Sequence, residues 1–334
     1  MPSSDEFLKS LDENDQVGQP RKPRRRHFGW KKIVISVVLL VTIAIIVLVI
    51  YAAQSLASIS KHPFSLNALN TDGSGRTNVL ILGVGDPGHS GQDLSDTNLV
   101  VSFDTSGKRV AQISVPRDLR VNIPGYGYNK INAANALGGS DLARQVVSTT
   151  LGIPINYVVT TDFTGLKDVV DGVGGIDVNV TARLVDTEYP CADNQFKACG
   201  LDIEPGLQHM DGARALEYVR CRKGTCGNDF GRAARQQEVI NLVRQKVMST
   251  DILLNPKKFS AVATAVRNNL TTDLSALNMV QLALLWQQQK GQAINLVLSN
   301  DPTSYLTGAY GSSDLVPRGG TFDKIQAKVQ GIFQ

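Results

Sequence analysis

Hydrophobic residues form one long uninterrupted run near the start of this 334-residue chain. The run covers residues 33–53, which are 21 residues without a charge. Coiled as an α-helix, it would be about 30 Å long, which matches the hydrocarbon core of a bilayer. The pattern therefore predicts a single transmembrane helix that serves as a signal anchor.

Shorter apolar runs follow a linker at residues 54–76, where serine, asparagine and glycine recur. These runs have the length and composition of buried strands. The strands are predicted at residues 77–85, 96–104, 109–116, 155–162, 174–180 and 293–299. A four-residue turn separates the second strand from the third, so we expect these two to pair as a hairpin.

Apolar residues at helical spacing occupy much of the chain between these strands. Helices are predicted at residues 132–151, 163–173, 212–220, 231–248, 256–269, 273–289 and from 322 onward. Asp211 is the predicted N-cap of the helix at 212–220. Residues 117–132 and 186–206 are predicted to be irregular. The alternation of strands and helices predicts an α/β fold, layered around one sheet, over residues 77–334.

Positive charge is concentrated before the predicted transmembrane helix. Residues 1–32 carry eight lysine and arginine side chains against five acidic ones, which leaves 26 against 25 in the rest. The positive-inside rule places this basic tail, predicted to be disordered, in the cytoplasm and everything beyond the helix outside the cell. The external domain is nearly neutral, which argues against a nucleic-acid partner.

The four cysteines all follow the predicted transmembrane helix, so they lie in an oxidising compartment. Disulfides are therefore expected, and the local pairs Cys191–Cys199 and Cys221–Cys226 are the simplest of the three possible pairings. Neither spacing is typical of a zinc site.

The helix at 231–248 has an unusual first turn. Its apolar stripe consists of Val239, Ile240, Val243 and Val247. Continued backward by helical spacing, the stripe reaches Gln236 and Arg232. A cation facing inward in the first turn is disfavoured by the helix dipole, so an anion is expected beside it. That anion is either a protein carboxylate or a ligand.

The stretch before this helix is rich in cations. Arg220 and Arg222 are two residues apart, which would place them on one side of an extended segment. A Cys221–Cys226 disulfide would fix how they point. Lys223 and Arg235 are predicted to be solvated.

Other charged residues cluster at predicted strand ends. Arg117 follows the third strand, and Lys130 lies in the loop beyond it. Asp86 ends the first strand and Asp96 opens the second, so the two carboxylates could share Mg²⁺ or Mn²⁺. Arginine binds phosphate oxygens in two-point fashion. Together these residues predict a site for a pyrophosphate and a divalent cation. Because the site is external and beside a membrane, a polyprenyl-linked glycan is the natural candidate.

The order of these motifs resembles the LytR-CpsA-Psr family. The matching motifs span about residues 77–249 and run from LILGVGD, SDT, SVPRDLRVNIPG and KIN to EYVRCR and DFGRAARQQ. The resemblance implies a mixed central sheet between helical layers, an αβα sandwich, with an apolar tunnel for a polyprenyl chain. Residues of that tunnel have no motif, so apolar helix positions such as Val239 could line the tunnel or lie in the core, and the core is the default. The chain departs from the family at Leu94, where members commonly have arginine.

The resemblance implies a phosphotransferase. Members are understood to move a glycopolymer from a polyprenyl-pyrophosphate carrier to a peptidoglycan hydroxyl, forming a phosphodiester. Their products include wall teichoic acids, capsules and arabinogalactan. Two other functions fit the same residues: hydrolysis of the polyprenyl pyrophosphate by water, or a non-catalytic role in envelope binding or regulation.

Individual roles are implied only where the motifs match. Asp86 and Asp96 match carboxylates that hold Mg²⁺, although Asp96 could instead act as a base. The residues that match phosphate-binding positions are Arg117, Lys130, Arg220, Arg222, Arg232 and Gln236. Arg117 and Asp96 are the candidate catalytic residues.

Overall fold

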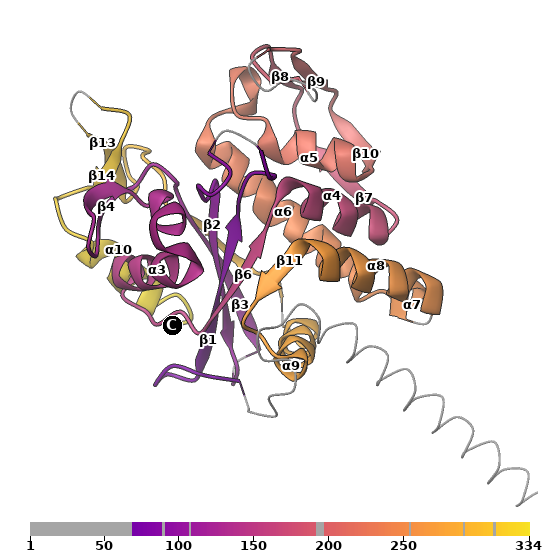
Figure 1. Ribbon diagram of the computed structural model, residues 1–334, viewed down its shortest axis with the longest axis horizontal. Coiled ribbons are helices and arrows are strands. Elements are labelled where there is room, and N and C mark those ends of the chain that lie inside the picture. The colour runs from indigo at the N-terminus through magenta and orange to yellow at the C-terminus, as the bar shows by residue number, and fades with distance from the viewer. Residues whose placement is uncertain are drawn as a thin grey trace, which may run out of the picture. The chain divides into compact units, whose positions relative to one another are not determined.

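The structure is a computed structural model that describes residues 69–88, 91–106, 108–191, 197–253, 255–289, 291–309 and 312–334 (Figure 1). The predicted cytoplasmic tail, the predicted transmembrane helix and most of the linker lie outside the described residues. Within those residues, no helix is both long enough and apolar enough to cross a membrane.

A six-stranded mixed sheet forms the centre of the described region, with strand order β11-β6-β1-β2-β3-β12. The strands are β1 (Arg76–Gly83), β2 (Thr97–Asp104), β3 (Arg109–Val115), β6 (Tyr157–Thr161), β11 (Leu270–Thr272) and β12 (Ile294–Val297). β2 pairs antiparallel with both β1 and β3, and its pairing with β3 confirms the predicted hairpin. β6 runs parallel to β1, and β12 runs parallel to β3.

Alternating residues of the sheet face two helical layers. Leu80 and Leu82 pack on one side, against α3 (Ala133–Leu151) and α10 (Asp323–Gln330). Val79 and Phe103 pack on the other side, against α6 (Asp229–Val247) and α9 (Ala276–Gln287). Full burial of each leucine stabilises the fold by about 2 kcal/mol. The expected αβα arrangement with a mixed sheet is confirmed.

A second core lies beside the sheet. There α4 (Phe163–Gly172), α5 (Gly212–Arg220), α7 (Thr250–Leu253) and α8 (Pro256–Asn269) pack near the pair β7 (Ile176–Val180) and β10 (Gly206–Met210). The Asp211 side chain accepts from the Arg214 amide at 2.8 Å, so the predicted N-cap of α5 is confirmed.

Short strands occupy the segments that were predicted to be irregular. β4 (Arg120–Ile123) and β5 (Gly127–Lys130) form a hairpin within residues 117–132. Within residues 186–206, β9 (Leu201–Ile203) pairs with β8 (Leu184–Asp186). Outside these two segments, where no element was predicted, β13 (Leu306–Gly308) pairs with β14 (Leu315–Pro317). A 3-10 turn, η1, covers Gly224–Cys226. The prediction of irregular structure was wrong in these segments, because three or four residues are too few to show a period.

Candidate active site

Three strand ends meet at one edge of the central sheet. Gly83 at the end of β1 pairs with Thr97 at the start of β2, and Asn98 pairs with Val115 at the end of β3. The segments that follow β1 and β3 and precede β2 therefore start at the same edge. These segments carry Asp86, Asp96 and Arg117.

Arg117 lies among three carboxylates at this edge. Its Nη1 donates to Asp96 Oδ1 at 2.7 Å, and its Nε is 3.4 Å from Asp229 Oδ2 and 3.5 Å from Asp118 Oδ2. Burial, the largest single influence, lowers the pKa of Arg117, but the three acids together outweigh it and raise the pKa. The buried Nε makes no hydrogen bond within the described residues, and its nearest counter-charges are the carboxylates of Asp229 and Asp118.

Lys130 is linked to Arg117 through Asp118. Its Nζ donates to Asp118 Oδ1 at 2.6 Å and lies 3.8 Å from Asp314 Oδ1. Burial alone would raise the pKa of Asp118, but the hydrogen bond from Lys130 and the charge of Arg117 lower it. The structure therefore places Lys130, as predicted, in the same charged cluster as Arg117.

Arg232 is buried in the first turn of α6, as its position in the apolar stripe predicted. Its Nη2 is 3.3 Å from the backbone oxygen of Asp96 and 3.5 Å from Asp229 Oδ1. Burial is the main cause that lowers the pKa of Arg232, and the charges of Arg117 and Arg222 lower it further, against the opposing charge of Asp229. The anion expected beside this helix start is thus partly a protein carboxylate.

Arg220 and Arg222 have no acidic partner within the part of the chain that the structure describes. The guanidinium of Arg220 lies over the ring of Phe163, 4.5 Å from its centroid, and 5.8 Å from that of Tyr189. Arg220 is the last residue of α5 rather than part of an extended segment, which corrects the local conformation expected there. These two arginines are the cations that most lack a counter-charge.

Arg235 was predicted to be solvated, and that prediction was wrong. It is 9% exposed, and its guanidinium donates to the backbone oxygens of Tyr218 and Cys226, both at 2.9 Å, and of Cys221. Burial is the main cause that lowers the pKa of Arg235. Lys223 lies on the surface as predicted and pairs with Glu188.

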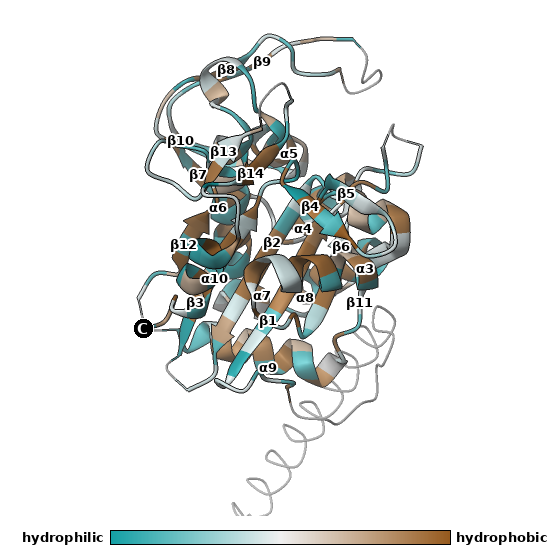
Figure 2. Ribbon diagram, turned by 90° about the vertical axis from the view of Figure 1, so that its left-hand side faces the viewer, coloured by the Kyte–Doolittle hydropathy of each residue, from teal (hydrophilic) through white to brown (hydrophobic). Residues whose placement is uncertain are grey.

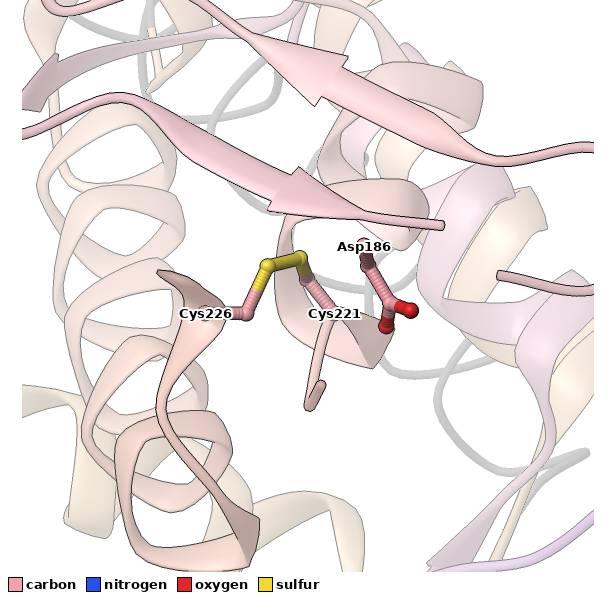
Figure 3. A group of neighbouring side chains, drawn as sticks. All are labelled: Asp186, Cys221 and Cys226. Carbon is pink, nitrogen blue, oxygen red and sulfur yellow. A yellow bond between two sulfur atoms is a disulfide. The ribbon is translucent and has the colours of Figure 1, made fainter. Parts of the chain in front are cut away.

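The segment that carries Arg222 is held by two further contacts (Figure 3). Cys221 and Cys226 form a disulfide, and Cys191 and Cys199 form the second, so the local pairing is present. Asp186 Oδ2 accepts from the amides of Arg222 and Lys223, at 3.2 Å and 3.1 Å. Asp186 lies close enough to both sulfur atoms to suggest a metal site. The sulfurs are bonded to each other, however, and the carboxylate serves the backbone, so this cluster is a structural one.

Among the described residues, three acids within 4 Å of the site cations were absent from the sequence-based set, and Asp314, 3.8 Å from Lys130, is one of them. Asp118 follows Arg117 directly, and Asp229 is the first residue of α6. The helix dipole favours an acid in the first turn, and this is enough to explain Asp229 from the sequence. Its contacts with Arg117 and Arg232 are visible only in the structure. No sequence pattern singled out Asp118 as a partner of Arg117 and Lys130.

An apolar cavity of about 400 Å³ adjoins the charged cluster. It lies between the sheet and helices α4, α5, α6 and α9, and its walls include Ile81, Val159, Leu166, Val169, Leu216, Val219 and Met248. Polar residues Thr97, Arg220 and Gln236 line it at the site end, while Arg244 and Trp286 line it near α9. A narrow apolar volume with cations at one end suits a ligand with a charged head and a long apolar tail.

The stripe of α6 lines this cavity and does not simply fill the core. Val239 is buried in the second core and also forms part of the cavity wall, with Val243 and Gln236 beside it. Of the two places open to Val239, core and tunnel wall, the residue contributes to both. The glutamine that α6 buries is Gln237, which donates to Ser114 Oγ at 2.8 Å.

Asp86 and Asp96 have different partners. Asp86 Oδ1 accepts from the amide of Thr164 at 2.9 Å, at the start of α4, whereas Asp96 Oδ1 accepts from Arg117. Neither Oδ2 accepts a hydrogen bond from the described residues. Two carboxylates with one oxygen each to spare suit Mg²⁺, which takes one or two protein carboxylates and completes its shell with phosphate and water.

A protein-family model covers the segments that form this site. The model of the LytR_cpsA_psr family matches residues 47–317.

The chain belongs to the LytR-CpsA-Psr family.

Relatives in this family have informative names. The chain is 36% identical over 236 residues to the polyisoprenyl-teichoic acid–peptidoglycan teichoic acid transferase TagU of Enterococcus faecalis, covering 70% of this chain and 69% of that protein. It is 31% identical over 282 residues to the corresponding transferase TagT of Bacillus subtilis, covering 80% and 85%. The regulatory protein MsrR of Staphylococcus aureus is 30% identical over 236 residues, covering 70% and 66%.

Solved structures of LytR-CpsA-Psr proteins share the fold. Bacillus subtilis TagV aligns with a TM-score of 0.61 at 27% identity, covering 78% of this chain and 98% of that one. A structure of TagT bound to LI-WTA aligns with a TM-score of 0.60 at 28% identity, covering 82% and 96%. The family protein YwtF (TagT) with bound octaprenyl pyrophosphate lipid aligns with a TM-score of 0.57 at 26% identity, covering 81% and 97%.

Proposed function

We propose that this protein transfers a glycopolymer from a polyprenyl-pyrophosphate carrier to a peptidoglycan hydroxyl and forms a phosphodiester. One observation carries the proposal: Arg220 and Thr97 line the same apolar cavity, and Thr97 follows Asp96, which contacts Arg117 and Arg232. A polyprenyl pyrophosphate is divided in a corresponding way, between an anionic head and an apolar tail. The names of TagU and TagT, and the lipid in the YwtF structure, support the assignment.

The charge balance of the cluster favours a pyrophosphate. Arg117, Lys130 and Arg232 already have carboxylates nearby, whereas Arg220 and Arg222 have none among the described residues. A glycan-linked pyrophosphate has two ionised oxygens, which the two unpaired arginines would neutralise. We propose that Gln236, beside Arg220 in the cavity wall, donates to the same phosphates.

The proposed reaction is a displacement at phosphorus. The acceptor hydroxyl forms a bond to the glycan-linked phosphorus, the bond to the bridging oxygen breaks, and polyprenyl phosphate leaves. Arg117 and Arg220 would stabilise the charge that develops on the phosphate oxygens, and such stabilisation is commonly the largest catalytic effect. The hydroxyl proton would pass to Asp96 or to water.

A divalent cation completes the proposal. Asp86 and Asp96 would hold Mg²⁺ or Mn²⁺ against the phosphates, and the cation would supply further neutralisation of charge on the pyrophosphate. We also propose the topology expected from the sequence: residues 33–53 span the cell membrane once, residues 1–32 are cytoplasmic, and the catalytic domain is extracellular. The two disulfides are consistent with an oxidising external compartment.

The test is transfer by the purified full-length protein from a labelled polyprenyl-pyrophosphate glycan to peptidoglycan. Arg117→Ala is expected to lower transfer at least 100-fold, about the effect of removing one transition-state donor. Arg109→Ala, which removes an arginine at the opposite end of β3 paired with Asp104, is the matched control and should retain transfer. Wild-type turnover in Arg117→Ala would remove that residue from the mechanism.

The destination of the label separates the alternatives. Label on peptidoglycan supports transfer, while label released as a free phosphorylated glycan, with no dependence on acceptor, supports hydrolysis. The double variant Asp86→Ala with Asp96→Ala separates catalysis from binding: retained cellular function would favour a non-catalytic role.

A further inference from the structure

The outer face of α9 is an apolar surface, defined here by the exposed Val280 and Leu284 and the half-buried Leu277. Val280 and Leu284 are 46% and 47% exposed and lie one turn apart. They are two of the six large hydrophobic side chains exposed within the described residues. The sequence from 275 to 289 has no charged residue, and α9 is predominantly hydrophobic in Figure 2. Such clustering marks a contact surface.

The apolar cavity extends from the charged cluster to this helix. Thr97, next to Asp96, lines one end. Ala283 and Trp286 of α9 line the other end, where the Trp286 ring lies 5.4 Å from the Phe103 ring in an edge-to-face contact. Along α6 the lining runs from Gln236 to Met248, twelve residues further on, so the cavity extends about 18 Å along that helix.

The chain enters the described region at the same place. Leu69, the first described residue, packs with Met279 and Trp286 against one core cluster. Fifteen residues separate Leu69 from residue 53, where the predicted transmembrane helix ends. The described chain therefore begins beside α9, separated by fifteen residues from the predicted transmembrane helix.

We propose that the outer face of α9 lies in the surface of the lipid bilayer and that the cavity receives the polyprenyl chain directly from the membrane there. This rests on the proposed function, because it assigns a route to the same lipid. A chain of many isoprene units is longer than the cavity, so its remainder stays in the bilayer while the pyrophosphate reaches Arg117. The site of transfer is thereby held about 18 Å above the membrane surface, the length of the cavity along α6.

Lipid quenching tests the contact directly. No described cysteine is free, so Leu284→Cys in the full-length protein introduces one defined thiol for a fluorophore. The protein is reconstituted into phosphatidylcholine and phosphatidylglycerol vesicles whose acyl chains carry bromine. The matched control is Leu207→Cys on β10, 75% exposed and remote from α9 in both ribbon views (Figures 1 and 2). Fluorescence at position 284 should be quenched at least threefold more than at position 207. Equal quenching at the two positions would overturn the proposal.

Transfer assays separate this proposal from the proposed function. Leu284→Asp should lower transfer from a long polyprenyl substrate in vesicles about tenfold, yet leave transfer from a short water-soluble prenyl analogue unchanged. Leu207→Asp should change neither. Equal transfer of the vesicle substrate by Leu284→Asp and wild type would refute the membrane route alone. Failure of wild type to transfer either substrate would refute the proposed function, while the quenching result would still decide the membrane contact.

Discussion

Arg235 and Lys223 belong to the same cation-rich stretch, yet their surroundings differ completely. Arg235 is buried and donates to three backbone oxygens of residues 218–226, whereas Lys223 pairs with Glu188 at the surface. Composition alone treats both as surface charge. What distinguishes them is that a five-donor guanidinium can satisfy several buried carbonyls at once, which an ammonium cannot match in geometry. Arg235 thereby holds the segment that presents Arg220 and Arg222.

Replacing Arg235 by methionine should destabilise the protein by about 2–3 kcal/mol, because buried carbonyl oxygens lose their donors. Urea unfolding of the full-length protein in detergent measures this change. The control Lys223→Met removes an exposed ion pair and should stay within about 0.5 kcal/mol of wild type. Equal stability of the two variants would mean that the contacts of Arg235 contribute nothing to the fold.

Asp118 should make stability depend on pH. Its pKa is lowered in the folded state by Lys130 and Arg117, against the effect of burial. A lowered folded pKa stabilises the protein above the unfolded value, and that stabilisation is lost as the pH falls through the folded pKa. Asp118→Asn should therefore cost about 1–2 kcal/mol at pH 7, and the difference from wild type should shrink below about pH 4.

Urea unfolding at several pH values measures this effect. Asp141→Asn is the control. Asp141 is 81% exposed, and its ion pair with Arg144 is long, at 3.6 Å, so it contributes little to stability. Its difference from wild type should remain within about 0.5 kcal/mol at all pH values. A constant penalty for Asp118→Asn down to pH 3 would show that its carboxylate is not held ionised by Lys130 and Arg117.

At the scale of elements, long periodic segments could be predicted and short ones could not. The buried runs of β1, β2 and β3 and the helical periods of α6 and α8 correspond closely to the predicted ranges. The hairpin β4–β5 was missed because each strand has four residues and Pro124 and Gly125 lie between them. That hairpin carries Lys130. The position of the Lys130 side chain depends on its contact with Asp118, which no local sequence pattern encodes.

Periodicity also could not distinguish core from cavity along α6. An apolar stripe is needed in both cases, because a lipid tail and a packed side chain require the same surface. Val243 and Val247 form the wall of the cavity, whereas Arg232 and Gln237 on the same helix are buried against protein. The space left between α6 and its neighbours is a property of how the helices pack, not of one helix.

The two disulfides offer a matched comparison. Replacing either pair by serine removes a short covalent loop and should cost about 2–3 kcal/mol of stability. The pair Cys221–Cys226 lies between Arg220 and the arginine-bearing α6, so its loss should also weaken pyrophosphate binding at least tenfold. Loss of Cys191–Cys199 should leave binding within about twofold. Thermal unfolding and isothermal titration with a short-chain prenyl pyrophosphate measure the two effects.

Equal binding losses from both pairs would show that Cys221–Cys226 acts through general stability. If both variants kept wild-type pyrophosphate binding, the contacts of Arg235 and Asp186 would be enough to hold residues 220–226 without the disulfide.

At the scale of the whole molecule, the site joins segments that are about a hundred residues apart. Asp96 and Arg117 come from one edge of the sheet, and Arg220, Arg222 and Arg232 come from the junction of α5 and α6. The order of motifs was enough to group these residues, and the contact from Arg232 to the backbone of Asp96 shows that the two groups do meet. The balancing acids Asp118 and Asp229 could not be chosen from the sequence, because the chain outside the predicted tail has 25 acids and most have surface or capping roles.

If the charged cluster binds the pyrophosphate and the apolar cavity binds the lipid tail, a substitution in the cavity should affect only long lipids. Val243 lines the cavity, so Val243→Trp should fill part of it and exclude some of the lipid tail. Each methylene that loses its burial costs about 0.8 kcal/mol, so the loss of two should raise KM for a long polyprenyl substrate about tenfold. A short prenyl pyrophosphate that reaches only the charged cluster should show an unchanged KM, since Arg220 and Arg117 are untouched. Gln245→Trp, at an exposed position of the same helix, is the control and should change neither value. Steady-state transfer kinetics with both substrates measure the effect, and an equal rise for the short and long lipids would show that the cavity does not hold the tail.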